Sequence, residues 1–381
     1  MYTVDNGRVA WVDALRILAC AMVVVSHCSD GFVAEFGADK EAFLTGTLVG
    51  SLMRPSVPLF VMITGVLLLP LPDGCSMASF YRRRVGRIAW PLVAWSLLLP
   101  VMAYLYFTGS GSGSANPSVD LSAYTPDVLV GRLWSWVLNF NFDTTPLWYL
   151  YMLVGLYLVM PVVGSWLRHA SRKDMLTFLG LWFATLFIPY IRLLAPAMGY
   201  AGNYGNYDIF GGCDWNVFST FHYVSGFIGY IILAYYLKCY PLHWSMKKMS
   251  TVFIPMFFVG YSITAGGYIW LQSIYPGDYA YLEIVWLFTG INVSMMTIPV
   301  FVFMQRLPSW LWRLWVGRVA SLTFGVYLCH FFFVMVFYDV FDVDGMPYLL
   351  RILGMAVSVS VTAGILTWVL SANRITRILV K

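Results

Sequence analysis

The sequence predicts an all-α, polytopic membrane protein: a bundle of about ten transmembrane helices with both termini in the cytoplasm. Hydrophobic residues make up 60% of the 381 residues and charged residues only 11%, whereas a soluble domain carries about 25% charged residues. A chain with so few charges cannot cover a surface that faces water, so its solvent must be largely lipid. Its long apolar runs, rather than ten-residue alternating ones, favour helices over a β-barrel.

Each run of about 20 apolar residues predicts one helix across the bilayer. The predicted spans are 12–31, 47–70, 88–108, 146–167, 175–195, 217–237, 250–271, 281–304, 319–341 and 348–370. We expect a single transmembrane domain over residues 1–381. The stretch 131–142, with two tryptophans, suits a helix that lies in the outer membrane interface.

Charged residues then predict the orientation, because loops on the cytoplasmic side carry an excess of Lys and Arg. One set of loops is basic: Arg82, Arg83, Arg84, Arg87, Arg168, Arg172, Lys173, Lys238, Lys247, Lys248, Arg306, Arg313, Arg318, Arg374, Arg377 and Lys381. The opposite set is acidic: Asp30, Glu35, Asp39, Glu41, Asp120, Asp127, Asp208, Asp214, Asp278, Asp342 and Asp344. The segregation holds over all ten predicted spans and fits a multi-pass protein of a bacterial inner membrane. The net charge of +5 is spread over these loops and does not indicate nucleic acid, and the six scattered cysteines predict no metal site or disulfide framework.

The first predicted span holds three ionisable residues, Asp13, Arg16 and His27, and such groups inside a bilayer are functional candidates because they are costly. Arg16 and His27 are eleven residues apart, about three helical turns, so they share a face at a separation of about 16 Å along the axis. Asp13 is placed to pair with Arg16. The alternatives are a snorkelling anchor for Arg16 and a packing histidine for His27, each about as probable as the functional role.

An arginine cluster precedes the third span, and within it Arg84 and Arg87 share a helical face. Such a cluster is either an orientation signal or a phosphate site, because guanidinium groups suit phosphate oxygens.

These features resemble the membrane acyltransferase-3 family, beginning with Arg16-x10-His27 in the stretch from Val12 to His27. Further similar stretches are Val57 to Leu68, Pro146 to Leu153, Ser321 to His330, and Arg84-x-x-Arg87. The similarity runs in order over nearly the whole chain, and the small single-domain form resembles O-acetyltransferases of surface polysaccharides and enterobacterial common antigen. Thr64 stands where Ser is common in the family, and no periplasmic hydrolase domain follows the helices, so we expect the chain to acylate its acceptor unaided.

The resemblance implies acyl transfer from cytoplasmic acyl-CoA, acetyl-CoA in the first instance, to a hydroxyl of an extracytoplasmic or lipid-linked glycan. No metal and no nucleic acid is expected. His27 would be the general base, either directly or through an acyl-histidine. The catalytic candidates are His27, Arg16, His330 and Glu283; the cofactor-binding candidates are Arg16, Arg84, Arg87, Arg83 and Tyr327; the acceptor-binding candidates are Trp148, Tyr149, His222 and Asp13.

Several of these assignments leave alternatives open. Glu283 would pair with Arg54 or orient His27, and the pairing is favoured. His330, three residues after Tyr327, is a second catalytic group, an oxyanion donor or a packing residue. His222 lies near the outer end of the sixth span, where it would face the acceptor.

Two other functions compete with acyl transfer. A glycan or lipid exporter or flippase would also suit ten helices with an intramembrane Arg and His, although we find no matching broken helices of the kind that mark many transporters. A polyprenyl-phosphate glycosyltransferase would use acidic residues of the first outer loop, where Glu35, Asp39 and Glu41 lie, but outward acidic charge explains these residues as well.

Overall fold

The computed structural model describes residues 4–5, 8–109, 113–199, 209–211, 219–307 and 314–380. The chain forms two compact units. The first unit holds Met1–Met53, Asp73–Pro161 and Pro308–Lys381, and the second holds Arg54–Pro72 and Val162–Leu307. The expectation of a single domain stays a prediction, and each unit is described by itself.

Ten helical segments in the described part of the chain are long and apolar enough to cross a membrane. They are Ala10–Val33, Lys40–Leu68, Met77–Gly109, Phe142–His169, Arg172–Ile191, Thr220–Cys239, Met246–Ile274, Tyr279–Arg306, Thr323–Val340 and Tyr348–Ala372. Every predicted span overlaps one of them, so the all-α, ten-span prediction is confirmed. Asp208, Asp214, Arg313 and Lys381, which contributed to the charge pattern, lie outside the described residues.

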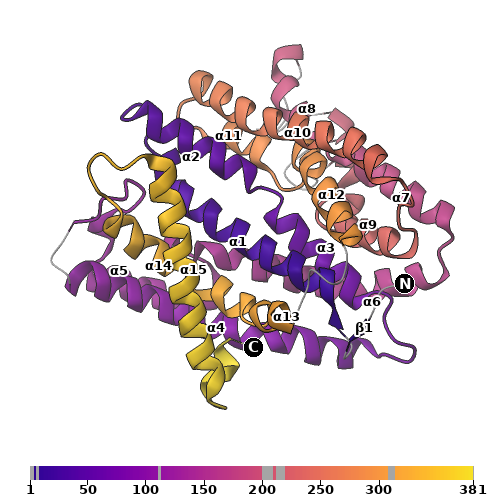
Figure 1. The fold of residues 1–381 in the computed structure, drawn as a ribbon, viewed down its shortest axis with the longest axis horizontal. Coiled ribbons are helices and arrows are strands. Elements are labelled where there is room, and N and C mark those ends of the chain that lie inside the picture. Colours follow the sequence, from indigo (N-terminus) through magenta and orange to yellow (C-terminus); the bar gives the residue numbers. More distant parts are fainter. Residues whose placement is uncertain are drawn as a thin grey trace. The chain divides into compact units, whose positions relative to one another are not determined.

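The first unit is built around a long helix, α1 (Ala10–Val33), which packs against α2 (Lys40–Leu52), α14 (Thr323–Val340) and α15 (Tyr348–Ala372) (Figure 1). The same unit contains β1 (Val4–Asp5), β2 (Arg8–Val9), α4 (Met77–Gly109), α5 (Pro126–Ser135), the start of α6 (Trp148–His169) and α13 (Leu314–Ala320). The two-residue strands form a small antiparallel pair. The helix α5 overlaps only the start, 131–135, of the stretch 131–142 where an interfacial helix was expected, and Trp134 on it is 85% exposed.

Helices α1 and α14 run parallel, as the first and ninth spans of an alternating bundle must. Cys20 on α1 donates to the carbonyl of Thr323 at 3.6 Å, and seven residues further along each helix the rings of His27 and His330 meet. Helix α15 returns antiparallel to α14 after a short turn, where Arg351 forms an ion pair with Asp342. This packing brings residues about 300 positions apart in sequence to the same depth.

The second unit contains α3 (Ser56–Leu68), α7 (Arg172–Thr185), α8 (Ile188–Leu194), α9 (Ile228–Cys239), α10 (Met246–Ile274), α11 (Tyr279–Trp286) and α12 (Ile291–Arg306). Helices α3 and α9 approach so closely that a methyl group on Gly65 would lie 2.6 Å from the carbonyl oxygen of Ile231. Close backbone contact at a small residue is a common way for membrane helices to pack. Lys238 donates to the carbonyls of Val66 and Leu69 and so caps the end of α3.

Four of the ten spans in the described part of the chain are interrupted, whereas the sequence predicted each span as one helix. Non-helical residues divide Lys40–Leu68 at 53–55, Arg172–Ile191 at 186–187, Thr220–Cys239 at 225–227 and Tyr279–Arg306 at 287–290. Pro55 lacks the backbone N–H that a continuous helix needs there. The guanidinium of Arg54 lies 3.9 Å above the ring of Trp286, at the end of α11.

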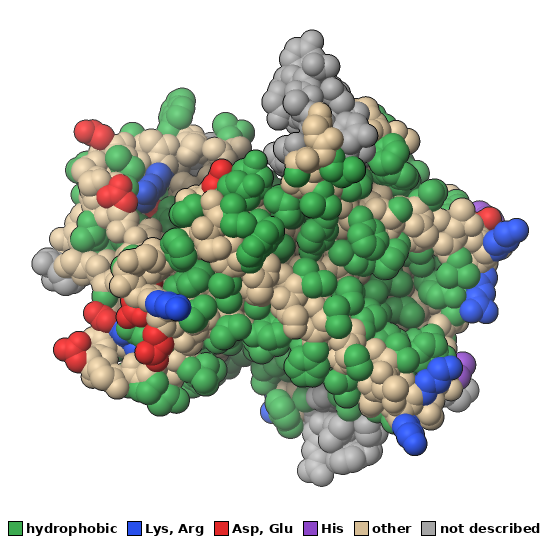
Figure 2. Space-filling model, turned by 90° about the horizontal axis from the view of Figure 1, so that it is seen from above, with side chains coloured by type: hydrophobic (Ala, Val, Ile, Leu, Met, Phe, Trp, Pro, Cys, Tyr) green, Lys and Arg blue, Asp and Glu red, His purple; other side chains and the backbone are tan. Residues whose placement is uncertain are grey.

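Exposed hydrophobic side chains cover much of the visible surface (Figure 2). Along α15 they recur every three or four residues in a stripe: Leu349, Leu350, Leu353, Val357, Val361, Ile365 and Trp368. Such a stripe, with no charged side chain in it, is what a lipid-facing helix presents.

Candidate active site

The outer half of α1 carries an Asp–His pair. His27 Nδ1 lies 2.7 Å from Asp30 Oδ2, and both side chains come from the same helical face because three residues separate them. The His27 side chain is 20% exposed and that of Asp30 is 44% exposed. An ionised carboxylate only accepts hydrogen bonds, so Nδ1 carries a proton, and in the neutral ring the lone pair is on the other nitrogen, Nε2.

A second imidazole lies beside His27. The ring centroids of His27 and His330 are 5.3 Å apart, and His330 is completely buried. His330 Nδ1 lies 2.6 Å from the carbonyl oxygen of Tyr327, which again only accepts, so Nδ1 is the protonated nitrogen. Its Nε2 is buried and has no hydrogen-bond partner among the described residues. Two neighbouring rings therefore each present an unprotonated Nε2.

Residues 113–147, here called the outer segment, close around this pair. Phe142 contacts Phe331, whose ring also packs edge-on against His27. The hydroxyl of Tyr327 donates to the carbonyl of Pro146. The end of the outer segment is thus attached to the helix that carries His330.

Two carboxylates hold the outer segment in place. Asp339 on α14 accepts hydrogen bonds from the Tyr106 hydroxyl at 2.9 Å and from Ser114 Oγ and Ala115 N, both at 2.9 Å. Asp143, which is fully buried, accepts from the Tyr124 hydroxyl and from Arg132 Nη1. Burial raises the pKa of the Tyr124 phenol, so this group remains a donor over the physiological pH range.

The predicted phosphate site involves the opposite half of α1, which carries Arg16, and the helix α4, which carries Arg84 and Arg87. Helix α4 begins at Met77, well before the predicted span, so Arg84 and Arg87 stand on a helix rather than in a loop. The positive charges of Arg84, Arg87 and Arg16 all act on the side chain of Tyr157 on α6. Arg16 also forms a 3.4 Å ion pair with Asp13. The three guanidinium groups, which come from two helices, are therefore all close enough to influence one tyrosine.

Two candidate cofactor-binding residues make contacts that separate them from this cluster. Arg83 donates to the carbonyl of Ser79 on its own helix and to Cys75 Sγ. Tyr327 is buried and its hydroxyl is bonded to the Pro146 carbonyl at the His27 end. Both remain predictions, with Arg84 and Arg87 better placed for a phosphate.

The acceptor-binding candidates are distributed over both units. Trp148 and Tyr149 begin α6, and the Tyr149 ring lies 5.6 Å from that of Tyr327, close to the outer segment. Asp13 pairs with Arg16 near the opposite end of α1. His222 lies in a short 3-10 helix, Ser219–Val224, of the second unit.

Glu283 is on α11 in the second unit, where its side chain is exposed. The carboxylate bonded to His27 Nδ1 is instead Asp30, which the sequence analysis had used only as an orientation charge. Its spacing of three residues from His27 was the signal that would have selected it.

One acidic residue of the predicted first outer loop, Asp39, has a structural role. Asp39 caps α2 by accepting from Ala42 N at 2.9 Å, and it accepts a hydrogen bond from the Tyr348 hydroxyl. That hydrogen bond lowers the pKa of Asp39. Asp39 therefore has a structural role as the cap of α2.

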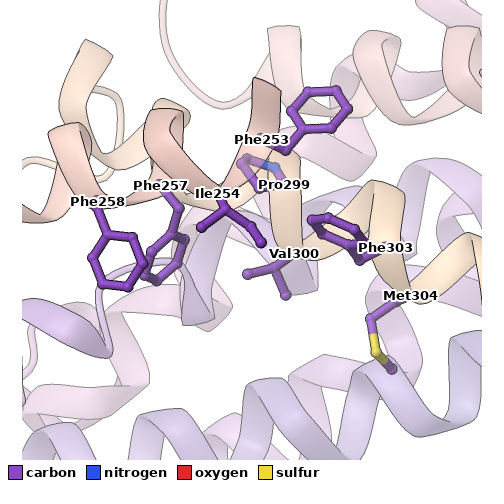
Figure 3. A pocket seen from close by; sticks show the side chains of 8 residues that line it. All are labelled: Phe253, Ile254, Phe257, Phe258, Pro299, Val300, Phe303 and Met304. Carbon is purple, nitrogen blue, oxygen red and sulfur yellow. The ribbon is translucent and has the colours of Figure 1, made fainter. Parts of the chain in front are cut away.

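A groove of about 300 Å³ in the second unit is lined by apolar side chains of α10 and α12, among them Phe253, Phe257, Phe258 and Phe303 (Figure 3). It offers no ionisable side chain that would hold a phosphate or move a proton.

The described residues thus define a multi-pass helical membrane protein in which two neighbouring histidines, one of them completely buried, lie at one end of α1, and arginines lie toward the other end. A family model described as an acyltransferase domain matches residues 9–371. The chain therefore belongs to the membrane acyltransferase-3 family, as the sequence motifs predicted, and is a multi-pass membrane acyltransferase. No curated protein and no solved structure matches the chain.

Proposed function

We propose that the protein moves an acyl group, acetyl in the first instance, from cytoplasmic acyl-CoA to a hydroxyl of an extracytoplasmic or lipid-linked glycan. The observation that carries this proposal is the placement of two residues on α1. Arg16 lies toward one end, near Arg84 and Arg87 of α4, and His27 lies toward the other end. The charged nucleotide of CoA would remain at the arginines. The thin pantetheine arm would carry the thioester along α1, over about 16 Å.

His27 acts as the general base in this proposal. Its Nε2 removes the proton of the acceptor hydroxyl while the oxygen attacks the thioester carbonyl. The carbon–sulfur bond then breaks, and the thiolate of CoA takes the proton back from the imidazolium. A positioned base contributes about 10²–10⁴-fold to the rate.

The test is release of CoA thiol from acetyl-CoA by the purified protein in lipid nanodiscs, with an extract of lipid-linked glycans from the native membranes as acceptor. His27→Ala should lower the rate by about 10²–10⁴-fold without loss of expression or membrane insertion. His243→Ala, which changes an exposed histidine of the second unit, is the matched control. Equal rates for the two variants would contradict the role of His27.

An exporter or flippase is the second candidate, because the interrupted spans resemble the discontinuous helices around which transporter sites form. The same assay separates the two functions. An exporter releases no thiol from acetyl-CoA, whereas an acyltransferase releases one thiol for each acyl group transferred.

A further inference from the structure

The hydrogen bond between His27 and Asp30 has a chemical consequence for the base. Neutral imidazole has one N–H and one lone pair, and the partner of one nitrogen decides which nitrogen keeps the proton. Because Asp30 Oδ2 lies 2.7 Å from Nδ1, the proton is held there and the lone pair is fixed on Nε2. The ring is further held by packing against His330 and Phe331.

Stability does not explain this pair. With 44% of its side chain exposed, Asp30 is well solvated, and an exposed pair one helical turn apart contributes little to folding. The carboxylate also lies at the predicted outer end of α1, next to Gly31, which packs against Tyr338. An acidic group at that end agrees with the predicted orientation of α1, but the orientation does not require the hydrogen bond from Asp30 to the imidazole.

We infer that Asp30 is the positioning residue of His27: it holds the Nδ1–H tautomer, points Nε2 toward the reacting hydroxyl and stabilises the imidazolium formed during transfer. This inference rests on the proposed function. Asp30 itself exchanges no proton and touches neither substrate. The proton leaves the acceptor hydroxyl for Nε2, and from there passes to the sulfur of the departing CoA.

The test uses Asp30→Asn in the nanodisc assay. The amide of the new side chain can donate its own N–H to Nδ1, which moves the imidazole proton to Nε2 and removes the base. We expect kcat to fall by about 10²–10⁴-fold, with the KM for acetyl-CoA within about twofold of wild type. Asp30→Glu restores a carboxylate one methylene further out and should recover part of kcat.

Controls separate this role from a structural one. Asp344→Asn changes an exposed acidic residue on the same predicted side and should leave kcat and KM unchanged. The double variant His27→Ala with Asp30→Asn should be no slower than His27→Ala alone, because residues that act as a unit are not additive.

The outcomes distinguish the two proposals. If wild type releases thiol, His27→Ala does not and Asp30→Asn equals wild type, the positioning role is overturned and the proposed function stands. An unchanged kcat with a raised KM for acetyl-CoA would also overturn the positioning role. If wild type itself releases no thiol, both proposals fail.

Discussion

His27 and His330 each give the Nδ1 hydrogen to an oxygen of their own helix, and this restricts what His330 can do. Its Nε2 accepts a hydrogen bond while the ring is neutral, because the Tyr327 carbonyl occupies Nδ1–H. A role as oxyanion donor would require a second proton on a completely buried ring, which burial opposes. The observed bonds suit His330 Nε2 better as a hydrogen-bond acceptor, from a substrate hydroxyl or from an amide N–H of the proposed pantetheine arm.

Gly65 gives a prediction about packing at the scale of one residue. A methyl group there would lie 2.6 Å from the Ile231 carbonyl oxygen and 3.0 Å from its Cα, and backbone atoms cannot move aside as a side chain can. We expect Gly65→Ala to destabilise the second unit by about 1–3 kcal/mol, the usual cost of overpacking. The thermal unfolding midpoint in detergent, followed by tryptophan fluorescence, measures this change.

The control for that experiment is Gly180→Ala, at a helical glycine of α7 with open space around the added methyl. Alanine is favoured over glycine in a helix by about 0.5–1 kcal/mol, so this variant should unfold at the same or a higher temperature. Equal midpoints for the two variants would show that α3 and α9 do not pack as closely as described.

At the scale of the element, α4 carries two of the arginines that we propose bind the donor. The helix begins at Met77, eleven residues before the predicted start of its span at residue 88. Arg84 and Arg87 therefore lie on consecutive turns of this helix, near Tyr157. Sequence spacing predicted their shared face correctly. The grouping of Arg16 with them came from the resemblance to the family, because spacing within one helix does not predict how α1, α4 and α6 pack.

Arg84→Ala and Arg87→Ala should each raise the KM for acetyl-CoA more than they lower kcat. A hydrogen bond to a charged group contributes about 1.5–3 kcal/mol, which corresponds to roughly 10–100-fold in KM. Arg83→Ala should have a smaller effect, because Arg83 is bonded to Ser79 and Cys75.

Lys247→Ala provides the control for charge alone, since Lys247 is exposed and lies on the same predicted side. Initial rates over a range of acetyl-CoA concentrations separate KM from kcat. If both arginine variants instead insert in reverse or fail to accumulate, and Lys247→Ala does not, the cluster acts as an orientation anchor.

Across the whole molecule, the spans were predictable and the contacts between distant spans were not. A run of about 20 apolar residues identifies a membrane helix because lipid leaves the backbone few alternatives. The interruption at Arg54-Pro55 was visible as a proline within a span, yet we had treated the span as continuous. Asp143, Arg132 and Tyr124 come together although they lie on different elements, with Arg132 on α5 and Asp143 in the 3-10 helix Phe142–Leu147, so a helical period does not predict their contact.

The orientation of the whole molecule yields the last prediction. The segregation of charge places Cys239 in the cytoplasm and Asp344 outside, and both positions are exposed. We expect a membrane-impermeant maleimide to label Asp344→Cys in intact cells and to label Cys239 only after lysis, with the other accessible cysteines changed to Ser. His27 lies at the Asp344 end of the first unit, since Phe32 follows it on α1 and packs against Tyr338 and Tyr348. Labelling in the reverse pattern would place the arginines outside, where no acyl-CoA is available, and the proposed direction of transfer would be wrong even if the histidines catalyse it.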